Sequence, residues 1–480
     1  MTMKMINFSN KVKRLGIILS LAFSFNLNAL ASQWQSPLLP ITDKFTLSNG
    51  LRVLIEEDHT APVASVVIIY DVGARNEVKG RSGFAHLFEH MMFEGSQNVG
   101  KTEHFKYIES VGGVLNASTH SDFTNYYEML PSNQIELALW LESDRMKSLK
   151  VTDENFHNQL ETVKEEKRLR IDNQPYIPAA LKLEELTFDN WSNSHAVIGS
   201  FEDLESSSTK DVKDFFNMYY APNNAVMVIT GDVDAKKLKP VIEKYFATIP
   251  AGPKPPAPNV VEPEQKQPKV VTLDDSHAKS KAVWMAFKAP GRREDEYYAL
   301  GLIEKILSGG DSSRLYQRMV KGDKIALSVN AEYDERRGPA AFETFAILKP
   351  GVNFDKAKDV IMDEIKKLQT VPVSEKELET AKNQILKTVF DSSSSFTLER
   401  SLGRAETICE YECFYDNPAL FEEDLNKYMK VTALDIQKAC KNLLTNAKST
   451  TVNVNPVEAV DRVDTHDKDG AKSSPKSTQG

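Results

Sequence analysis

Residues 83–93 read Gly83-Phe84-Ala85-His86-Leu87-Phe88-Glu89-His90-Met91-Met92-Phe93. The apolar residues of this stretch recur with a helical period, which predicts a largely buried helix. Ser82 is placed to cap its start, and Gly95 suits its end. Because His86 and His90 are four apart, both imidazoles project from one face and can hold one metal ion. Glu89 can then reach a water on that metal without ligating the metal itself.

The spacing His-x-x-Glu-His is the inverted form of a common zinc-protease motif. The alternative is a pair of unrelated core histidines beside an acid. Two imidazoles and a carboxylate buried without partners on an apolar helix would be costly, which favours the metal. The motif therefore predicts one hydrolytic zinc ion per chain.

A third ligand is expected in the helix predicted after Thr152, which is a plausible N-cap. Leu160 and Val163 belong to its apolar stripe, and Glu166 continues that inward face. A carboxylate there needs a cation, and a zinc ion already held by two histidines would provide one. The alternative is a surface acid in the charged run 164–168. Periodicity alone leaves both open.

Composition describes a soluble globular protein of two to four domains, with 480 residues, 41% hydrophobic and 26% charged. The formal charge of -9 argues against nucleic acid as the main partner.

The N-terminus predicts export. Residues 1–31 combine basic residues, an apolar run over 15–30 and the small-x-small site Ala29-Leu30-Ala31, as in a signal peptide. Asn26 and Asn28 interrupt the run, which is too short to span a bilayer, and no other stretch predicts a membrane span. The mature chain is expected in a bacterial periplasm. Three cysteines follow much later, and we expect structural roles, with a Cys413–Cys440 disulfide as one hypothesis.

The remaining pattern predicts strands and helices in two successive domains. The first domain, 32–250, contains a predicted hairpin at 45–55, strands at 64–72, 124–130 and 225–231, and helices at 134–149, 209–219 and 238–249. A proline-rich linker covers 251–268. The second domain covers 269–456, and the polar tail 457–480 is expected to be disordered.

The second domain repeats the first. Leu87-x-Glu89-His90 with Gly95 recurs 215 positions later as Leu302-x-Glu304-Lys305 with Gly310. His86 falls on Gly301, and His90 falls on Lys305. We expect two homologous α+β domains, the second without metal ligands.

These motifs resemble the insulinase/pitrilysin family of inverted-motif zinc peptidases, in its short two-domain branch, over nearly all of residues 40–456. The resemblance rests on the following segments: 83–93, Gly112-Gly113, Asn116-Ala117, Thr162-Val163-Lys164-Glu165-Glu166, 197–204, Tyr220-Ala221-Pro222-Asn223-Asn224 and Ser312-Ser313-Arg314-Leu315-Tyr316.

The resemblance implies a mixed β-sheet with packed helices in each domain, the two forming half of a clamshell around an unfolded peptide. The family's third zinc ligand lies about 76 positions beyond the second histidine, which implies Glu166 and ranks Glu165 second. Asn116 and Ala117 would lie on the edge strand that pairs with the substrate backbone.

Two departures from the family pattern stand out. Gln159 replaces an acid seven residues before Glu166, which weakens tuning of the site more than metal binding. Active members place an Arg and a Tyr where this chain has Val320 and Leu327. The resemblance therefore implies a second, homologous subunit that supplies the Arg/Tyr pair, with a homodimer otherwise.

The sequence predicts a periplasmic zinc metallopeptidase in which His86, His90 and Glu166 bind zinc and Glu89 is the general base. The rival hypothesis is a non-catalytic or weakly active subunit, or a peptide-binding module, of a heteromeric peptidase.

Overall fold

The computed structural model describes residues 37–457, except 392 and 395. The predicted signal peptide and residues 458–480 of the predicted tail lie outside the described residues. Within the described part of the chain, no helix is long and apolar enough to cross a membrane.

The first sheet contains six strands in the order β1-β2-β6-β3-β5-β4. Their bounds are β1 Asp43–Thr46, β2 Arg52–Glu57, β3 Val63–Tyr70, β4 Val114–Thr119, β5 Thr124–Pro131 and β6 Ala225–Gly231. β2 runs parallel to β6, and the other pairs are antiparallel. The central strands β3 and β6 are almost wholly buried and rich in Val and Ile, as expected for strands covered on both faces.

The second sheet repeats this topology in the order β7-β11-β8-β10-β9. Its strands are β7 Lys269–Asp275, β8 Ala282–Ala289, β9 Ala326–Asp334, β10 Ala340–Leu348 and β11 Ser449–Pro456. β7 runs parallel to β11 and the other pairs are antiparallel, as in β2-β6-β3-β5-β4. The prediction of two homologous α+β domains is confirmed.

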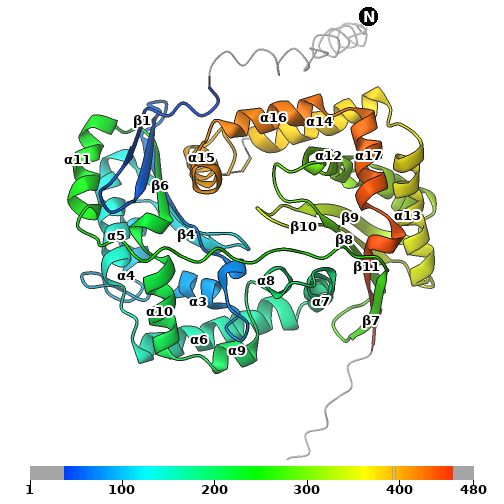
Figure 1. Cartoon of the computed structure of the whole chain (residues 1–480), viewed down its shortest axis with the longest axis horizontal. Helices are drawn as coiled ribbons and strands as arrows, with labels where there is room; N and C mark the ends of the chain where they lie inside the picture. The colour runs from blue at the N-terminus through cyan, green and yellow to red at the C-terminus, as the bar shows by residue number, and fades with distance from the viewer. Residues whose placement is uncertain (1–36, 392, 395, 458–480) are drawn as a thin grey trace, which may run out of the picture.

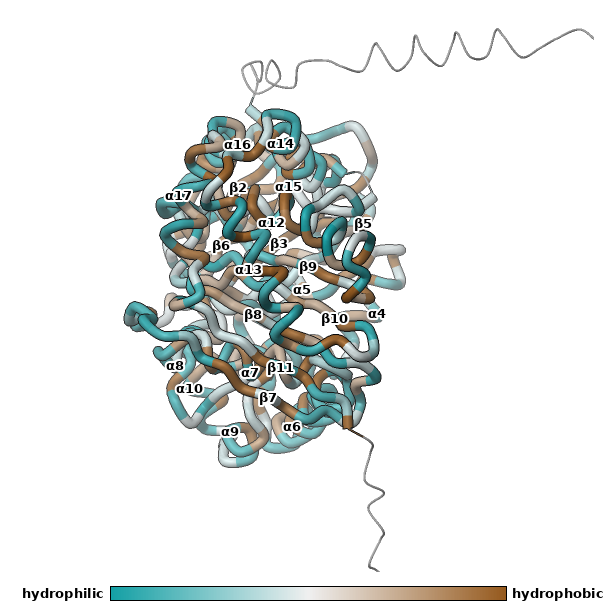
Figure 2. The backbone as a smooth tube through the Cα atoms, turned by 90° about the vertical axis from the view of Figure 1, so that its right-hand side faces the viewer, coloured by the Kyte–Doolittle hydropathy of each residue, from teal (hydrophilic) through white to brown (hydrophobic). Residues whose placement is uncertain are grey.

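Helices cover one face of each sheet and enclose a separate apolar core. The first set is α3 Phe84–Met91, α4 Glu103–Ser110, α5 Ile135–Ser148, α6 Asp153–Lys167, α9 Phe201–Glu205, α10 Thr209–Tyr219 and α11 Ala235–Phe246, whereas the short α8 Trp191–Ser194 contacts α7 Ile177–Thr187. The second is α12 Tyr297–Ser308, α13 Phe354–Thr370, α14 Glu375–Phe390, α16 Leu420–Lys430 and α17 Ala433–Leu443. Figure 2 shows the alternation of polar and apolar residues along α13, whose apolar residues pack into the second core.

The remaining face of each sheet is covered by a helix from the other half of the sequence. α15, Ser401–Tyr415, packs on β3 and β6 of the first sheet, whereas α7, Ile177–Thr187, packs on β8 and β11 of the second (Figure 1). The contacts are apolar: α15 buries Ile408 against the first sheet, and α7 buries Leu183 against the second. This exchange ties the two domains together, because removing either helix would expose the face of a sheet.

Two local expectations were wrong. Ser82 does not cap α3: Gly83 occupies the N-cap with a φ of 85°, and Ser82 Oγ donates to Asp203 instead. The Cys413–Cys440 disulfide is absent. All three cysteines are free and buried; Cys409 and Cys413 pack between α15 and the first sheet, and Cys440 lies in the second core. The exchange of α15 separates Cys413 from Cys440.

Candidate metal centre

Two helices bring the three predicted ligands together. His86 and His90 lie one turn apart on α3, and Glu166 lies in the last turn of α6, which packs against α3. Glu166 Oε2 is 3.2 Å from His90 Nε2 and 3.7 Å from His86 Nε2. The Glu166 side chain is 16% exposed, whereas Glu165 is 57% exposed and pairs with Arg168. The geometry therefore favours Glu166, which faces the histidines, over the exposed Glu165.

The donor atoms fit a zinc ion. Ligands at about 2.0–2.1 Å from a tetrahedral zinc lie about 3.3 Å from one another, which is close to the separations observed. Two imidazoles and one carboxylate are also a donor set of catalytic zinc sites, which leave a fourth position open. Burial and then the charge of His90 lower the pKa of the His86 imidazole to about 4, which favours the neutral, ligating form.

Glu89 lies beside this group of ligands. The hydroxyl of Thr119, at the end of β4, donates to Glu89 Oε2 at 2.7 Å. Burial raises the pKa of the Glu89 carboxyl, and the hydrogen bond from Thr119 opposes that shift. The bond fixes one carboxylate oxygen. Thr119 was not among the predicted site residues, although its place in the strand after Asn116-Ala117 was the available signal.

A buried carboxylate, that of Glu77, holds the start of the motif helix. Glu77 accepts hydrogen bonds from the backbone N–H groups of Gly83, at 2.9 Å, and Ala85, at 2.8 Å. His195 Nε2 lies 2.9 Å from the same carboxylate. Burial lowers the pKa of His195, but the hydrogen bond and charge of Glu77 outweigh it and leave that pKa raised. This pair was missed, because Glu77 and His195 meet only after folding.

Gln159 lies on the buried face of α6, and its side chain contacts Glu94 rather than Glu166. Its Nε2 donates to Glu94 Oε1 at 2.6 Å, and Lys101 pairs with the other oxygen of Glu94 at 2.7 Å. Arg170, just beyond α6 in the π-turn Arg168–Asp172, reaches Glu166 Oε1 at 2.8 Å. The oxygen of Glu166 that faces away from the histidines is therefore held by an arginine.

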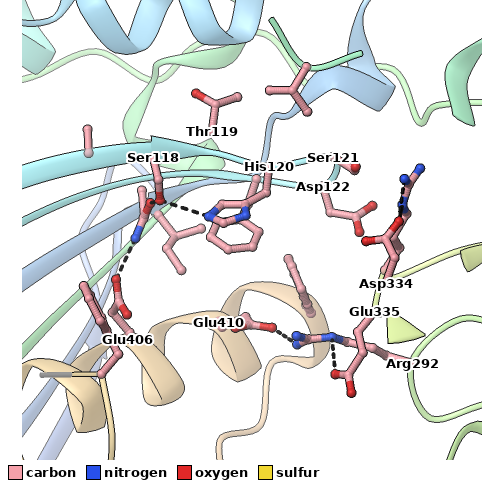
Figure 3. A pocket seen from close by; sticks show the side chains of 18 of the residues that line it. Ser118, Thr119, His120, Ser121, Asp122, Arg292, Asp334, Glu335, Glu406 and Glu410 are labelled. Carbon is pink, nitrogen blue, oxygen red and sulfur yellow. Dashed lines mark hydrogen bonds and ion pairs between the residues drawn. The ribbon is translucent and has the colours of Figure 1, made fainter. Parts of the chain in front are cut away.

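β4 is the edge strand of the first sheet, since it pairs only with β5. Asn116 is exposed and Ala117 is buried. The Ala117 N–H donates to Asn116 Oδ1 at 2.9 Å, so Asn116 satisfies a backbone donor on this strand. Both residues line a cavity of about 690 Å³ between the two domains, shown in Figure 3.

The second domain lacks the donor set at the matching place. Gly301 occupies the position of His86, and a side chain there would meet the ring of Tyr428 at 2.9 Å. Lys305 occupies the position of His90 and pairs with Glu304. Glu304 accepts from the Tyr333 N–H on β9, much as Glu89 accepts from the hydroxyl of a β4 residue. The structure of the repeat persists without its metal chemistry.

A second group of potential ligands, His104, Glu128 and Glu142, is buried in the first core. A cation already lies among them, because Arg145 donates from Nε to Glu142 at 2.9 Å and stacks 4.3 Å above the ring of Tyr126. This network is a buried ion pair and not a metal site.

Val320 is partly buried in the second core, and Leu327 is exposed on the edge strand β9. The neighbouring arginines are already engaged. Arg314 makes two hydrogen bonds of 2.7 Å to Glu377, and Arg318 makes one to Asp323. These ion pairs hold both guanidinium groups on the second domain.

Comparison with known protein families matches both halves of the chain. Residues 52–195 match the insulinase domain of peptidase family M16, and residues 207–385 match the M16 inactive domain. The chain belongs to the insulinase family, M16. The insulinase-family match of the first half contains the histidine pair and Glu89, and the inactive-domain match falls largely on the half without ligands.

Similar M16 proteins share most of this chain. The zinc protease PqqE of Helicobacter pylori is 27% identical over 89% of this chain and 95% of its own. The crystal structure of a protease from Helicobacter pylori superposes with a TM-score of 0.81 at 27% identity, covering 86% of this chain and 99% of that one. The M16 inactive domain from Pseudomonas fluorescens, at 18% identity, shares the fold with a TM-score of 0.76, covering 88% of this chain and 99% of that one.

Proposed function

We propose that this M16 chain is a zinc metallopeptidase that hydrolyses peptides or unfolded polypeptide segments. One observation carries the proposal: His86, His90 and Glu166 converge from two helices with zinc-like separations while Glu89 stands beside them and outside the set. A structural zinc site is usually closed by four protein ligands. Three ligands with an adjacent carboxylate fit hydrolysis better.

Zinc bound by these residues would polarise the scissile carbonyl and lower the pKa of water to about 7. Glu89 accepts a proton from the attacking water and delivers it to the leaving amine. Thr119 orients the Glu89 carboxylate through its 2.7 Å hydrogen bond, which leaves the other oxygen for proton transfer. No covalent intermediate with a serine or cysteine is needed.

The substrate would bind as an added strand along β4. An extended peptide can pair with the free edge of the sheet through backbone hydrogen bonds, at Asn116 and Ala117. Such pairing tolerates many sequences but requires an extended backbone. Unfolded polypeptides should therefore be cleaved, and folded domains should resist.

The experiment measures zinc content and hydrolysis together on the mature chain, residues 32–480. We expect one zinc per chain and cleavage of reduced, unfolded polypeptide that stops with a chelator and returns with zinc. A chain that binds no zinc would refute the proposal. Zinc binding without hydrolysis, alone and with a homologous subunit, would favour the rival function as a non-catalytic subunit or peptide-binding module, with which the inactive-domain match of 207–385 is also compatible.

We propose further that a homologous subunit completes the site by supplying an Arg/Tyr pair. Val320 and Leu327 have no polar side-chain atoms to stabilise an oxyanion, and removal of one such donor commonly costs about 10²–10³ in rate. The alternative is a substitute within the chain, such as Arg314, Tyr316 or Arg318. The engagement of Arg314 and Arg318 with acids supports a partner over these two arginines. Assays of the homodimer and of a mixture with a homologous subunit decide the point. Full activity of the homodimer would reject the partner.

We propose a periplasmic location for the chain. The support is the sequence of residues 1–31, with its basic start, apolar run and Ala29-Leu30-Ala31 site. Fractionation of a Gram-negative host that expresses the full chain, with N-terminal sequencing of the product, tests it. Cytosolic protein with an intact N-terminus would reject it.

A further inference from the structure

The cavity beside β4 is lined by acids, and one of them lacks a cation. Five acids on its wall meet arginines, in the pairs Asp122–Arg75, Glu184–Arg336, Asp334–Arg336, Glu335–Arg292 and Glu410–Arg292. The sixth, Glu406 on α15, meets no cation among the residues that the structure describes. Its one hydrogen bond comes from Asn125 Nδ2, at 2.7 Å. Three arginines serve these five acids, so the wall has an excess of carboxylates, and Glu406 is the acid that no cation of the described residues meets.

Glu406 is connected to the edge strand through side chains. Asn125 on β5 accepts from the Ser118 hydroxyl, and Ser118 Oγ lies 2.9 Å from His120 Nε2 (Figure 3). Ser118 and Asn125 are opposite one another in the β4–β5 pairing, so both point to the face covered by α15. The next residue, Thr119, points to the other face, where it meets Glu89.

A peptide strand on β4 would follow the same alternation. The peptide residue paired with Ser118 points to the α15 face, because directly opposed residues share a face. That side chain enters the cavity, whose volume of about 690 Å³ accommodates a long side chain. Its neighbours in the peptide point to α3 and the metal ligands.

We propose that Glu406 forms a subsite for a basic side chain, lysine or arginine, of the peptide residue paired with Ser118. The inference rests on the proposed peptidase function and adds a substrate class to it. A cation offers the half-buried carboxylate the partner that the wall does not supply. Burial raises the pKa of Glu406 to about 7, consistent with an unpaired acid.

The test measures binding separately from cleavage. Fluorescein-labelled decapeptides of one Ala/Ser sequence carry lysine at each position in turn, with norleucine peptides as matched controls. Dissociation constants are measured by anisotropy on the zinc-loaded Glu89→Gln chain, alone and combined with Glu406→Gln. Glu399→Gln is the control, because Glu399 is exposed, precedes α15 and does not line the cavity.

We expect one position at which lysine binds about tenfold more tightly than norleucine. Glu406→Gln should reduce that ratio to about one without weakening the norleucine peptide, and Glu399→Gln should leave it unchanged. No lysine preference at any position, or a preference that survives Glu406→Gln, would overturn the subsite.

Cleavage of the same peptides by the wild-type chain separates the two proposals. Lysine-selective binding without hydrolysis, alone or with a homologous subunit, would leave the subsite standing and reject the peptidase function. Hydrolysis of these peptides, with no lysine preference that depends on Glu406, would support the peptidase function and reject the subsite.

Discussion

Replacement of Glu77 by glutamine should weaken both the fold and metal binding, although Glu77 is not a predicted ligand. The glutamine oxygen can accept from Gly83 or Ala85 but not both, since the amide NH₂ then faces the second N–H. One unsatisfied buried N–H costs about 1–3 kcal/mol. Loss of the negative charge at the start of α3 costs about 0.3–1 kcal/mol more. Relief from burying a carboxylate offsets part of this, leaving about 2 kcal/mol.

Thermal unfolding and zinc titration measure the effect. A loss of about 2 kcal/mol lowers the Tm by roughly 4–8 °C for a domain of 150–250 residues. Zinc affinity should fall about tenfold, which is the lower end of the range expected when a residue that supports the ligands is lost. Glu165→Gln is the control, because it removes the same charge from an exposed site near the ligands. A Glu77→Gln chain with the Tm and zinc affinity of that control would refute the reasoning.

Three further outcomes are expected. Glu89→Gln should retain zinc but lose peptide hydrolysis by at least about 10²-fold, since it removes the proton acceptor; activity within a few-fold of the parent would contradict this. Glu166→Gln should lower zinc affinity far more than Glu165→Gln does, and metal analysis showing equal zinc in both would reject Glu166 as a ligand. The lysine preference in peptide binding should increase as pH rises through about 7, because the Glu406 carboxyl is neutral below its pKa and charged above it; a pH-independent ratio would count against the Glu406 subsite.

Local sequence determined the parts of this protein that depend on near neighbours. The helical period of 83–93 predicted α3, and the spacing of His86 and His90 placed both imidazoles on one face, because side chains four apart on a helix are adjacent. The recurrence of the Leu-x-Glu pattern 215 positions later predicted the second domain by a different argument, as a repeat of the first. These inferences needed no knowledge of packing.

Tertiary structure decided which distant side chains meet. Periodicity placed Glu166 on the inward face of α6 but could not decide between a metal ligand and a surface acid, since that depends on how α6 lies against α3. Nor could the sequence show that α15, from the second half, covers the first sheet and that α7, from the first half, covers the second. This exchange brings Glu406 to the cavity beside β4 and keeps Cys413 away from Cys440. The physical reason is that amphipathic patterning specifies that a face must be buried, whereas its partner is set by the packing of the whole chain.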